Sequence, residues 1–193
     1  MPVACLCAIN GYKVYGTDID KNKVSMIEKG ICPIKDDYLE KEFEKVRDKI
    51  KIKSTGEAVI ESNIIIICVP TPIDNNHIPD LTALKSAATS VSEAMKEDTL
   101  VIIESTIFPG TTEEVVFPIL KKSNVNFYLA HCPERIDPGN KNFTIENIPR
   151  VVSGIDKESS TKAYEFYKSI INAPITELSS VKAVEATKIM ENT

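Results

Sequence analysis

The stretch Asn63-Ile64-Ile65-Ile66-Ile67-Cys68-Val69-Pro70-Thr71-Pro72 decides the fold class of this chain. An unbroken apolar run that ends at prolines is typical of a strand in a parallel sheet, because both faces of such a strand are covered. Similar runs lie at 100–104, before the polar segment 105–112, and at 127–130, before Cys132-Pro133-Glu134-Arg135. Ligands bind outside the carboxyl ends of parallel strands. The three polar segments therefore predict one shared cleft.

The rest of the sequence alternates between strand and helix patterns, which predicts an α/β fold with a doubly wound parallel sheet. We expect strands at 12–17, 63–69, 99–104, 125–130, 150–153 and 174–178. We expect helices at 2–10, 21–29, 38–50, 81–95, 111–122 and 157–171, and one more that begins at 179. Gly11 and Gly30 are placed to end the first two helices. Because the chain opens on a helix, we expect the first strand of the sheet and its glycine loop to be missing.

The composition argues against several classes of protein. The 193 residues carry a net charge of −5, whereas nucleic-acid binders usually present a basic face. No stretch has the roughly 18 apolar residues of a membrane span, and no signal peptide is visible, so we expect a cytoplasmic protein that contacts neither nucleic acid nor membrane. Five cysteines without a CxxC pair indicate neither a disulfide framework nor a metal site. Cys68, inside an apolar run, is expected in the core.

Four motifs in a fixed order carry a resemblance to a known family. Val14-Tyr15-Gly16-Thr17-Asp18-Ile19-Asp20 precedes the segments at 69–72, 104–112 and 132–135. This arrangement resembles the N-terminal half of the UDP-glucose/GDP-mannose dehydrogenase family, whose members are NAD-dependent nucleotide-sugar 6-dehydrogenases. The runs 133–140 and 148–152 look most like the members that oxidise UDP-N-acetylhexosamines.

The resemblance implies a domain organisation. It places a Rossmann-like NAD-binding domain at 1–178 and the start of a central helical dimerisation domain at 179–193. The last glycine of the family's fingerprint falls immediately before Met1, and Asp18 lies at the expected distance of about 20 residues from that turn. No cysteine follows Cys132, so the family's nucleophile is not in this sequence. We therefore expect the isolated chain to be an inactive fragment, truncated at both ends, of an enzyme whose full-length relatives are homodimers.

The expected cofactor residues are Asp18, Lys23, Thr71 and Thr106. A carboxylate at the end of the strand at 12–17 can accept hydrogen bonds from both ribose hydroxyls and disfavours a 2′-phosphate, which points to NAD rather than NADP. The alternative for Asp18 is a helix N-cap, but Asp20 fits that position better. Lys23 is placed near the adenosine phosphates by the resemblance and is otherwise a surface lysine. Thr71, in a rigid turn between two prolines, is expected to contact the cofactor, with a plain turn as the alternative.

The resemblance also assigns chemistry to the other motifs. It implies that Thr106 contacts the nicotinamide side and helps to hold a water, and that Glu134 positions the water that hydrolyses a thioester. Arg135 and Ile136 are expected to contact the nucleotide sugar. Lys188 and Asn192 lie one helical turn apart, and the resemblance implies that they stabilise an oxyanion and contact the substrate. If the resemblance is set aside, Glu134 and Arg135 are interpreted as an exposed ion pair. Lys188 and Asn192 are then interpreted as part of the solvated face of a helix.

These implications give a function with alternatives. The resemblance implies oxidation of the C6 alcohol of a UDP-sugar, such as a UDP-N-acetylhexosamine, to the uronate, with NAD as the cofactor. One alternative is another NAD-dependent dehydrogenase, of the 6-phosphogluconate or hydroxyacid type, on the same fold. The other is a non-catalytic, truncated Rossmann module that binds a partner through an open sheet edge.

Overall fold

The computed structural model describes residues 1–74, 78–134 and 147–191, and its strands form two sheets. A parallel pair consists of β1 (Val14–Gly16) and β2 (Ile50–Ile52). The second sheet has the order β3-β4-β5-β6-β7. Its strands are β3 (Ile64–Ile67), β4 (Thr99–Ile103), β5 (Phe127–His131), β6 (Arg150–Gly154) and β7 (Ile175–Glu177). β3, β4 and β5 run parallel, so their carboxyl ends lie at one edge.

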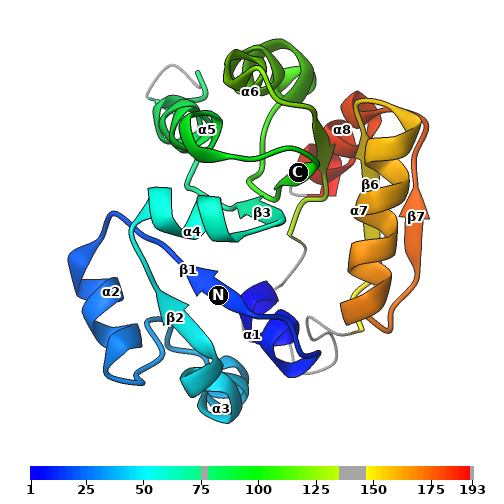
Figure 1. Cartoon of the computed structure of the whole chain (residues 1–193). Helices are drawn as coiled ribbons and strands as arrows, with labels where there is room; N and C mark the ends of the chain where they lie inside the picture. The colour runs from blue at the N-terminus through cyan, green and yellow to red at the C-terminus, as the bar shows by residue number, and fades with distance from the viewer. Residues whose placement is uncertain (75–77, 135–146, 192–193) are drawn as a thin grey trace.

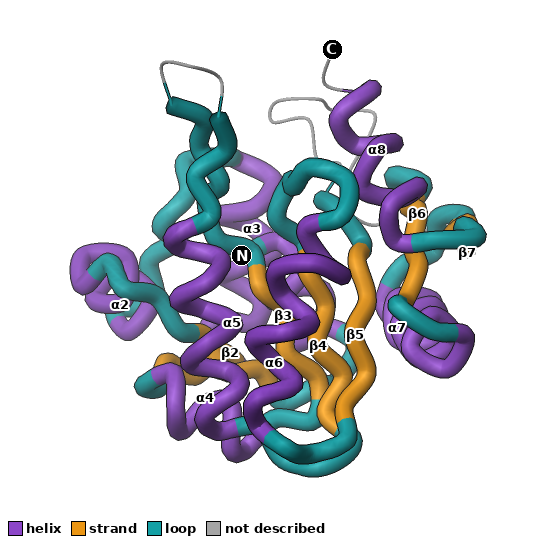
Figure 2. The backbone as a smooth tube through the Cα atoms, turned by 90° about the horizontal axis from the view of Figure 1, so that it is seen from above, coloured by secondary structure: helices purple, strands orange, loops and turns teal. Residues whose placement is uncertain are grey.

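Helices connect the strands and form the outer layers (Figure 1). The α-helices are α1 (Pro2–Ile9), α2 (Lys21–Glu28), α3 (Asp37–Val46), α4 (Thr55–Glu61), α5 (Thr82–Ala94), α6 (Phe117–Leu120), α7 (Lys157–Ile170) and α8 (Val181–Glu191). Shorter helical turns are η1 (Arg47–Lys49), the π-helical η2 (Thr112–Val116) and η3 (Lys121–Ser123). Figure 2 shows α5 and α6 lying along one side of β3, β4 and β5.

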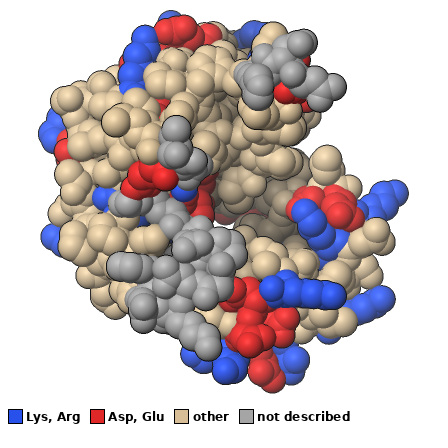
Figure 3. All heavy atoms as spheres, turned by 180° about the vertical axis from the view of Figure 1, so that it is seen from behind, with Lys and Arg blue, Asp and Glu red and all other residues tan. Residues whose placement is uncertain are grey.

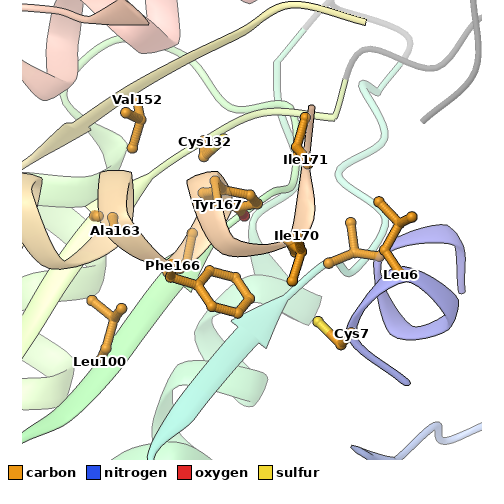
Figure 4. Close-up of a cluster of buried hydrophobic side chains, with 13 residues drawn as sticks. Leu6, Cys7, Leu100, Cys132, Val152, Ala163, Phe166, Tyr167, Ile170 and Ile171 are labelled. Carbon is orange, nitrogen blue, oxygen red and sulfur yellow. The ribbon is translucent and has the colours of Figure 1, made fainter. Parts of the chain in front are cut away.

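Apolar side chains fill the space on both faces of the larger sheet. On one face, Val101, Ile103 and Leu129 are fully buried in a cluster with residues of α5 and α6. On the other face, α7 and α1 meet over the sheet, and Figure 4 shows side chains of this cluster, among them Leu6 and Cys7 of α1 and Phe166 and Tyr167 of α7. Strand β4 lies between the two layers, which explains why all five of its residues are buried.

The α/β, Rossmann-like prediction is confirmed, but β6 and β7 run opposite to β3, β4 and β5. β6 is antiparallel to β5, with Ala130 opposite Gly154 and His131 opposite Ser153. An antiparallel neighbour does not require a crossover helix, and the sequence predicts no helix between the strands at 125–130 and 150–153. The reversal has a structural consequence, because it brings Arg150, the first residue of β6, to the edge where β3, β4 and β5 end.

Two further expectations were wrong in detail. The helix expected at 38–50 ends at Val46, and β2 and α4 follow it where no element was predicted. Cys68 is exposed and not a core residue, because β3 is an edge strand of the larger sheet and the chain leaves the sheet at Ile67. The division into domains at 178/179 stays a prediction.

Candidate functional site

The polar segments after β3 and β4 are joined by two hydrogen bonds. The Ser105 hydroxyl donates to the carbonyl of Val69 at 2.8 Å, and the Thr71 hydroxyl donates to the carbonyl of Thr106 at 2.5 Å. Ser105 is buried whereas Thr106 is exposed, so the first bond ties the loops together beneath the surface. Thr71 and Thr106 therefore lie side by side at the carboxyl edge of the sheet.

The segment after β5 joins the same edge through Glu134. Its backbone N–H donates to the carbonyl of Glu104 at 3.3 Å, and its Oε1 accepts from Nη2 of Arg150 at 2.9 Å. The Glu134 side chain is 29% exposed, whereas that of Arg150 is fully buried. The structure thus brings Thr71, Thr106 and Glu134 to one edge of the sheet, as the strand-end pattern predicts.

Beneath this edge lies a buried polar cluster that the sequence reading missed. Nη1 of Arg150 donates to Oε1 of Glu104 at 3.1 Å, and the Tyr167 hydroxyl donates to the same oxygen at 2.7 Å. Glu104 is only 4% exposed. Buried charges in proteins are paired, and Arg150 here bridges an interior carboxylate and the carboxylate at the cleft. The Arg150 Nε finds no acceptor among the described residues.

Burial and pairing set the protonation states in this cluster. Burial raises the pKa of the Glu104 carboxyl above its ordinary value, and the Arg150 guanidinium opposes that rise. Burial on its own would lower the pKa of Arg150, but the Glu134 and Glu104 carboxylates raise it, so the guanidinium stays charged. Burial also raises the pKa of the Cys132 thiol to about 12. Cys132 is therefore a neutral core thiol and not a nucleophile.

Asp18 and Lys23 lie together, after β1 and in the first turn of α2. The Asp18 Oδ1 accepts from the N–H of Asp20 at 2.9 Å, and its Oδ2 is 3.9 Å from Nζ of Lys23. Asp20 is the N-cap of α2, accepting from the N–H of Asn22 at 2.9 Å, which confirms the cap assignment. With 38% of its side chain exposed, the Asp18 carboxylate is reachable from solvent, and a carboxylate in this position suits the hydroxyls of a ribose.

The last helix and the long loop contain the other expected residues. Lys188 lies in α8 and is half-buried, and α8 contacts β5, β6 and η2. Arg135, Ile136 and Asn192 lie outside the described residues. His131, the last residue of β5, is fully buried, but neither ring nitrogen has a partner in the described part of the chain. Burial lowers the pKa of His131 to about 3, so its ring is neutral.

The sequence contains signals for the missed residues. Glu104 ends an apolar run and Arg150 begins another. A charged side chain at the end of a buried strand requires a partner of opposite charge or hydrogen bonds. What the sequence does not contain is the pairing, since the two residues are 46 positions apart.

Comparison of the sequence with known protein families identifies the family of this chain. Residues 1–171 match the model of the UDP-glucose/GDP-mannose dehydrogenase family, NAD binding domain. The chain belongs to the UDP-glucose/GDP-mannose dehydrogenase family. Because the matched part is the NAD-binding domain of this family, its cofactor is NAD. The partly exposed carboxylate of Asp18 after β1 fits that cofactor.

Several named relatives of this family cover the whole chain. It is 36% identical to Protein CapL from Staphylococcus aureus, over 100% of this chain and 46% of that protein. It is 37% identical to UDP-N-acetyl-D-mannosamine dehydrogenase from Methanococcus aeolicus, over 100% of this chain and 44% of that protein. The solved UDP-D-ManNAc dehydrogenase of Pyrococcus horikoshii superposes with a TM-score of 0.91 at 34% identity, covering 99% of this chain and 47% of the other. The chain thus spans about half the length of these relatives.

A more distant neighbour shows the fold alone. The 3-hydroxyisobutyrate dehydrogenase of Mycobacterium tuberculosis superposes with a TM-score of 0.70 but at 19% identity, over 99% of this chain and 54% of the other. The shared fold therefore supports the alternative of a hydroxyacid-type dehydrogenase, but the family match of this chain does not.

Three further observations concern helix length, surface charge and a cavity. In the described ranges no helix is long and apolar enough to cross a bilayer. On the face seen in Figure 3, basic and acidic side chains are mixed around a hollow near the middle, with no broad basic area.

A separate cavity of about 340 Å³ is lined in part by Asn63, Ile64 and Leu100. These residues lie at the amino ends of β3 and β4, so this cavity is away from the carboxyl edge where Thr71, Thr106 and Glu134 meet.

Proposed function

We propose that this chain is the cofactor-binding part of an NAD-dependent dehydrogenase that oxidises the C6 alcohol of a UDP-N-acetylhexosamine to the uronate. The observation that carries the proposal is the joining of Thr71, Thr106 and Glu134 at one edge of the sheet, with Arg150 holding Glu134. The substrate class is supported by relatives named UDP-N-acetyl-D-mannosamine dehydrogenase and, at 35% identity, UDP-N-acetyl-D-glucosamine 6-dehydrogenase from Pseudomonas aeruginosa.

The proposed roles follow from the geometry. NAD, when bound, supplies the hydride acceptor, and Asp18 is the residue that holds its ribose. Thr71 and Thr106 form one wall of the cleft, because their hydrogen bond fixes the two loops relative to each other. Arg150 pairs with the Glu134 carboxylate and fixes its orientation. A fixed carboxylate that is partly open to solvent is able to orient a water and accept its proton.

Two further elements complete the proposal. Lys188, one helical turn from the buried part of α8, supplies a positive charge that stabilises an oxyanion at the substrate carbon. The 193 residues contain no cysteine after Cys132, and Cys132 is buried and neutral. We therefore propose that these 193 residues alone bind NAD without sustaining turnover.

The experiment measures NAD binding and NADH formation separately. Titration calorimetry with NAD on the purified chain tests the cofactor site, with Asp18→Asn as the weakened variant. NADH absorbance with UDP-N-acetylmannosamine, UDP-N-acetylglucosamine and UDP-glucose tests the reaction, both for the chain and for the protein that contains it. Absence of NAD binding refutes the proposal and favours the non-catalytic module. Turnover by the isolated chain at an ordinary enzyme rate refutes the inactivity of the fragment.

A further inference from the structure

A buried carboxylate on α8 serves none of the roles assigned so far. Glu185 is fully buried. Its Oε2 accepts from the N–H of Gly110 at 2.6 Å, and its Oε1 accepts from the N–H and the hydroxyl of Thr112 at 2.8 and 2.7 Å. All three donors belong to the turn that links β4 to η2. Such bonds to a charged acceptor are about twice as strong as neutral ones.

The turn is built to offer these donors. Gly110 has φ +98, in the left-handed region that glycine adopts at little cost, and Thr112 begins η2. The first N–H groups of a helical segment lack partners within it. The Thr111 side chain does not cap this segment, because its hydroxyl donates to the carbonyl of Phe108 at 2.7 Å. Glu185 supplies the missing acceptor from 73 residues further along the chain.

A second contact fixes the same helix from the outside. Nζ of Lys182 lies 2.8 Å from Oε1 of Glu114 and 3.6 Å from Oε2 of Glu113. Lys182 and Glu185 are three residues apart and therefore share a face of α8. Lys188 is three residues beyond Glu185, so it lies one turn further along α8 and is rotated by about 60° from Glu185. The exposed contacts of Lys182 contribute little to the docking of α8 on the turn. The buried Glu185 carboxylate contributes more to its position, because it cannot shift along the turn without losing its three donors.

We propose that Glu185 is a positioning residue that sets the register of α8 against the Phe108–Thr112 turn and thereby presents Lys188 at the carboxyl edge of the sheet. The inference rests on the proposed function only for the role of Lys188. The docking of α8 by Glu185 stands on the contacts alone. A shift of one residue along the helix would rotate Lys188 by about 100° away from the cleft.

The test compares Glu185→Gln with a matched control, Glu114→Gln, which removes a carboxylate that contacts α8 at the surface. In Glu185→Gln the amide group faces three donors with one acceptor oxygen, so we expect hydrogen exchange of the α8 amides to accelerate at least tenfold. Exchange in β4 serves as the internal reference for global unfolding and is expected to stay unchanged. Thr112→Val, which deletes one of the three bonds, is the milder variant should Glu185→Gln fail to fold.

Turnover of the protein that contains this chain supplies the second readout. We expect kcat to fall at least tenfold in Glu185→Gln while KM for NAD stays within twofold, because Asp18 and Lys23 lie on other elements. Unchanged α8 exchange overturns the proposal, and so does faster exchange with an unchanged kcat. If the wild-type protein oxidises no UDP-sugar, the proposed function fails, and the exchange data alone decide whether Glu185 fixes α8.

Discussion

Replacing Arg150 by methionine tests the buried polar cluster beneath the cleft. The guanidinium is fully buried and bonded to Glu104 at 3.1 Å and to Glu134 at 2.9 Å. Methionine fills similar volume but leaves the Glu104 carboxylate, itself 4% exposed, with the Tyr167 hydroxyl as its one remaining side-chain partner among the described residues. Removing one member of a buried ion pair costs about 3–5 kcal/mol. For a chain of this size that is a drop in Tm of about 6–20 °C.

Urea unfolding followed by circular dichroism measures this loss. The matched control is Lys157→Met, which breaks the exposed Lys157–Glu177 pair at 2.5 Å and is expected to change the free energy of unfolding by no more than about 0.5 kcal/mol. The double variant Glu104→Gln with Arg150→Met is expected to recover part of the loss, because no uncompensated carboxylate remains in the core.

The stability loss in Arg150→Met depends on pH through the protonation of Glu104. Burial raises the pKa of Glu104, and in Arg150→Met the opposing guanidinium is gone. The folded variant therefore holds a proton on Glu104 at pH values where the unfolded chain does not, and its deficit shrinks as the pH falls toward the unfolded pKa. A loss below about 1 kcal/mol at pH 7 would contradict the stated range, and a deficit that grows on acidification would refute the argument for a buried, uncompensated carboxylate.

Three other substitutions address separate features. His131→Leu is expected to resist acid better than the wild type. Because the folded His131 has a pKa of about 3, only the unfolded chain takes up its proton below pH 6.5, which costs the wild type about 3 kcal/mol at pH 4.5. Gly110→Ala is expected to lower the free energy of unfolding by about 1–2 kcal/mol, because φ is +98 and the added Cβ would lie 2.9 Å from Oε1 of Glu114. Asp18→Asn is expected to weaken NAD binding about tenfold or more, since one charged hydrogen bond is worth about 1.5–3 kcal/mol.

Each of these has its own measurement and control. Urea midpoints between pH 7 and 4.5 test His131→Leu, and parallel curves for variant and wild type would count against a neutral buried ring. Gly56→Ala, at a glycine with nothing within 4 Å of an added Cβ, is the control for Gly110→Ala in thermal melts. Calorimetry with NAD tests Asp18→Asn against Asp80→Asn, and an equal effect of both would remove Asp18 from the cofactor site.

The sequence predicts those parts of the molecule whose signals are local. Gly11 and Gly30 do have positive φ after helices, Asp20 does cap α2, and the polar strand ends do meet. One local signal was present and overlooked: Ser54 and Glu57 form a capping box, with the Glu57 carboxylate accepting from the N–H of Ser54 at 3.2 Å. That spacing marks the start of a helix.

What the sequence could not predict depends on distant residues meeting in space. The pairing of Glu104 with Arg150 requires the reversed direction of β6, which no spacing encodes. The burial of Glu185 likewise depends on how α8 meets a turn 73 residues earlier in the chain. From spacing alone, the polar side chains of that helix fit a solvated stripe, and only the packing separates a buried anchor from a surface carboxylate.

The separation of the strands into two sheets has a consequence for how the molecule melts. Across the described residues no ladder joins β1 and β2 to the larger sheet. The smaller sheet borders its own apolar cluster of Cys5, Ala8, Leu39, Phe43, Val46 and Ile50. Segments with a separate core and few shared backbone bonds open as cooperative units of their own. Helix α1 links this cluster to the core of the larger sheet, because its Leu6 and Cys7 pack there. We therefore expect hydrogen exchange to report a lower opening free energy for β1 and β2, near Asp18, than for β4.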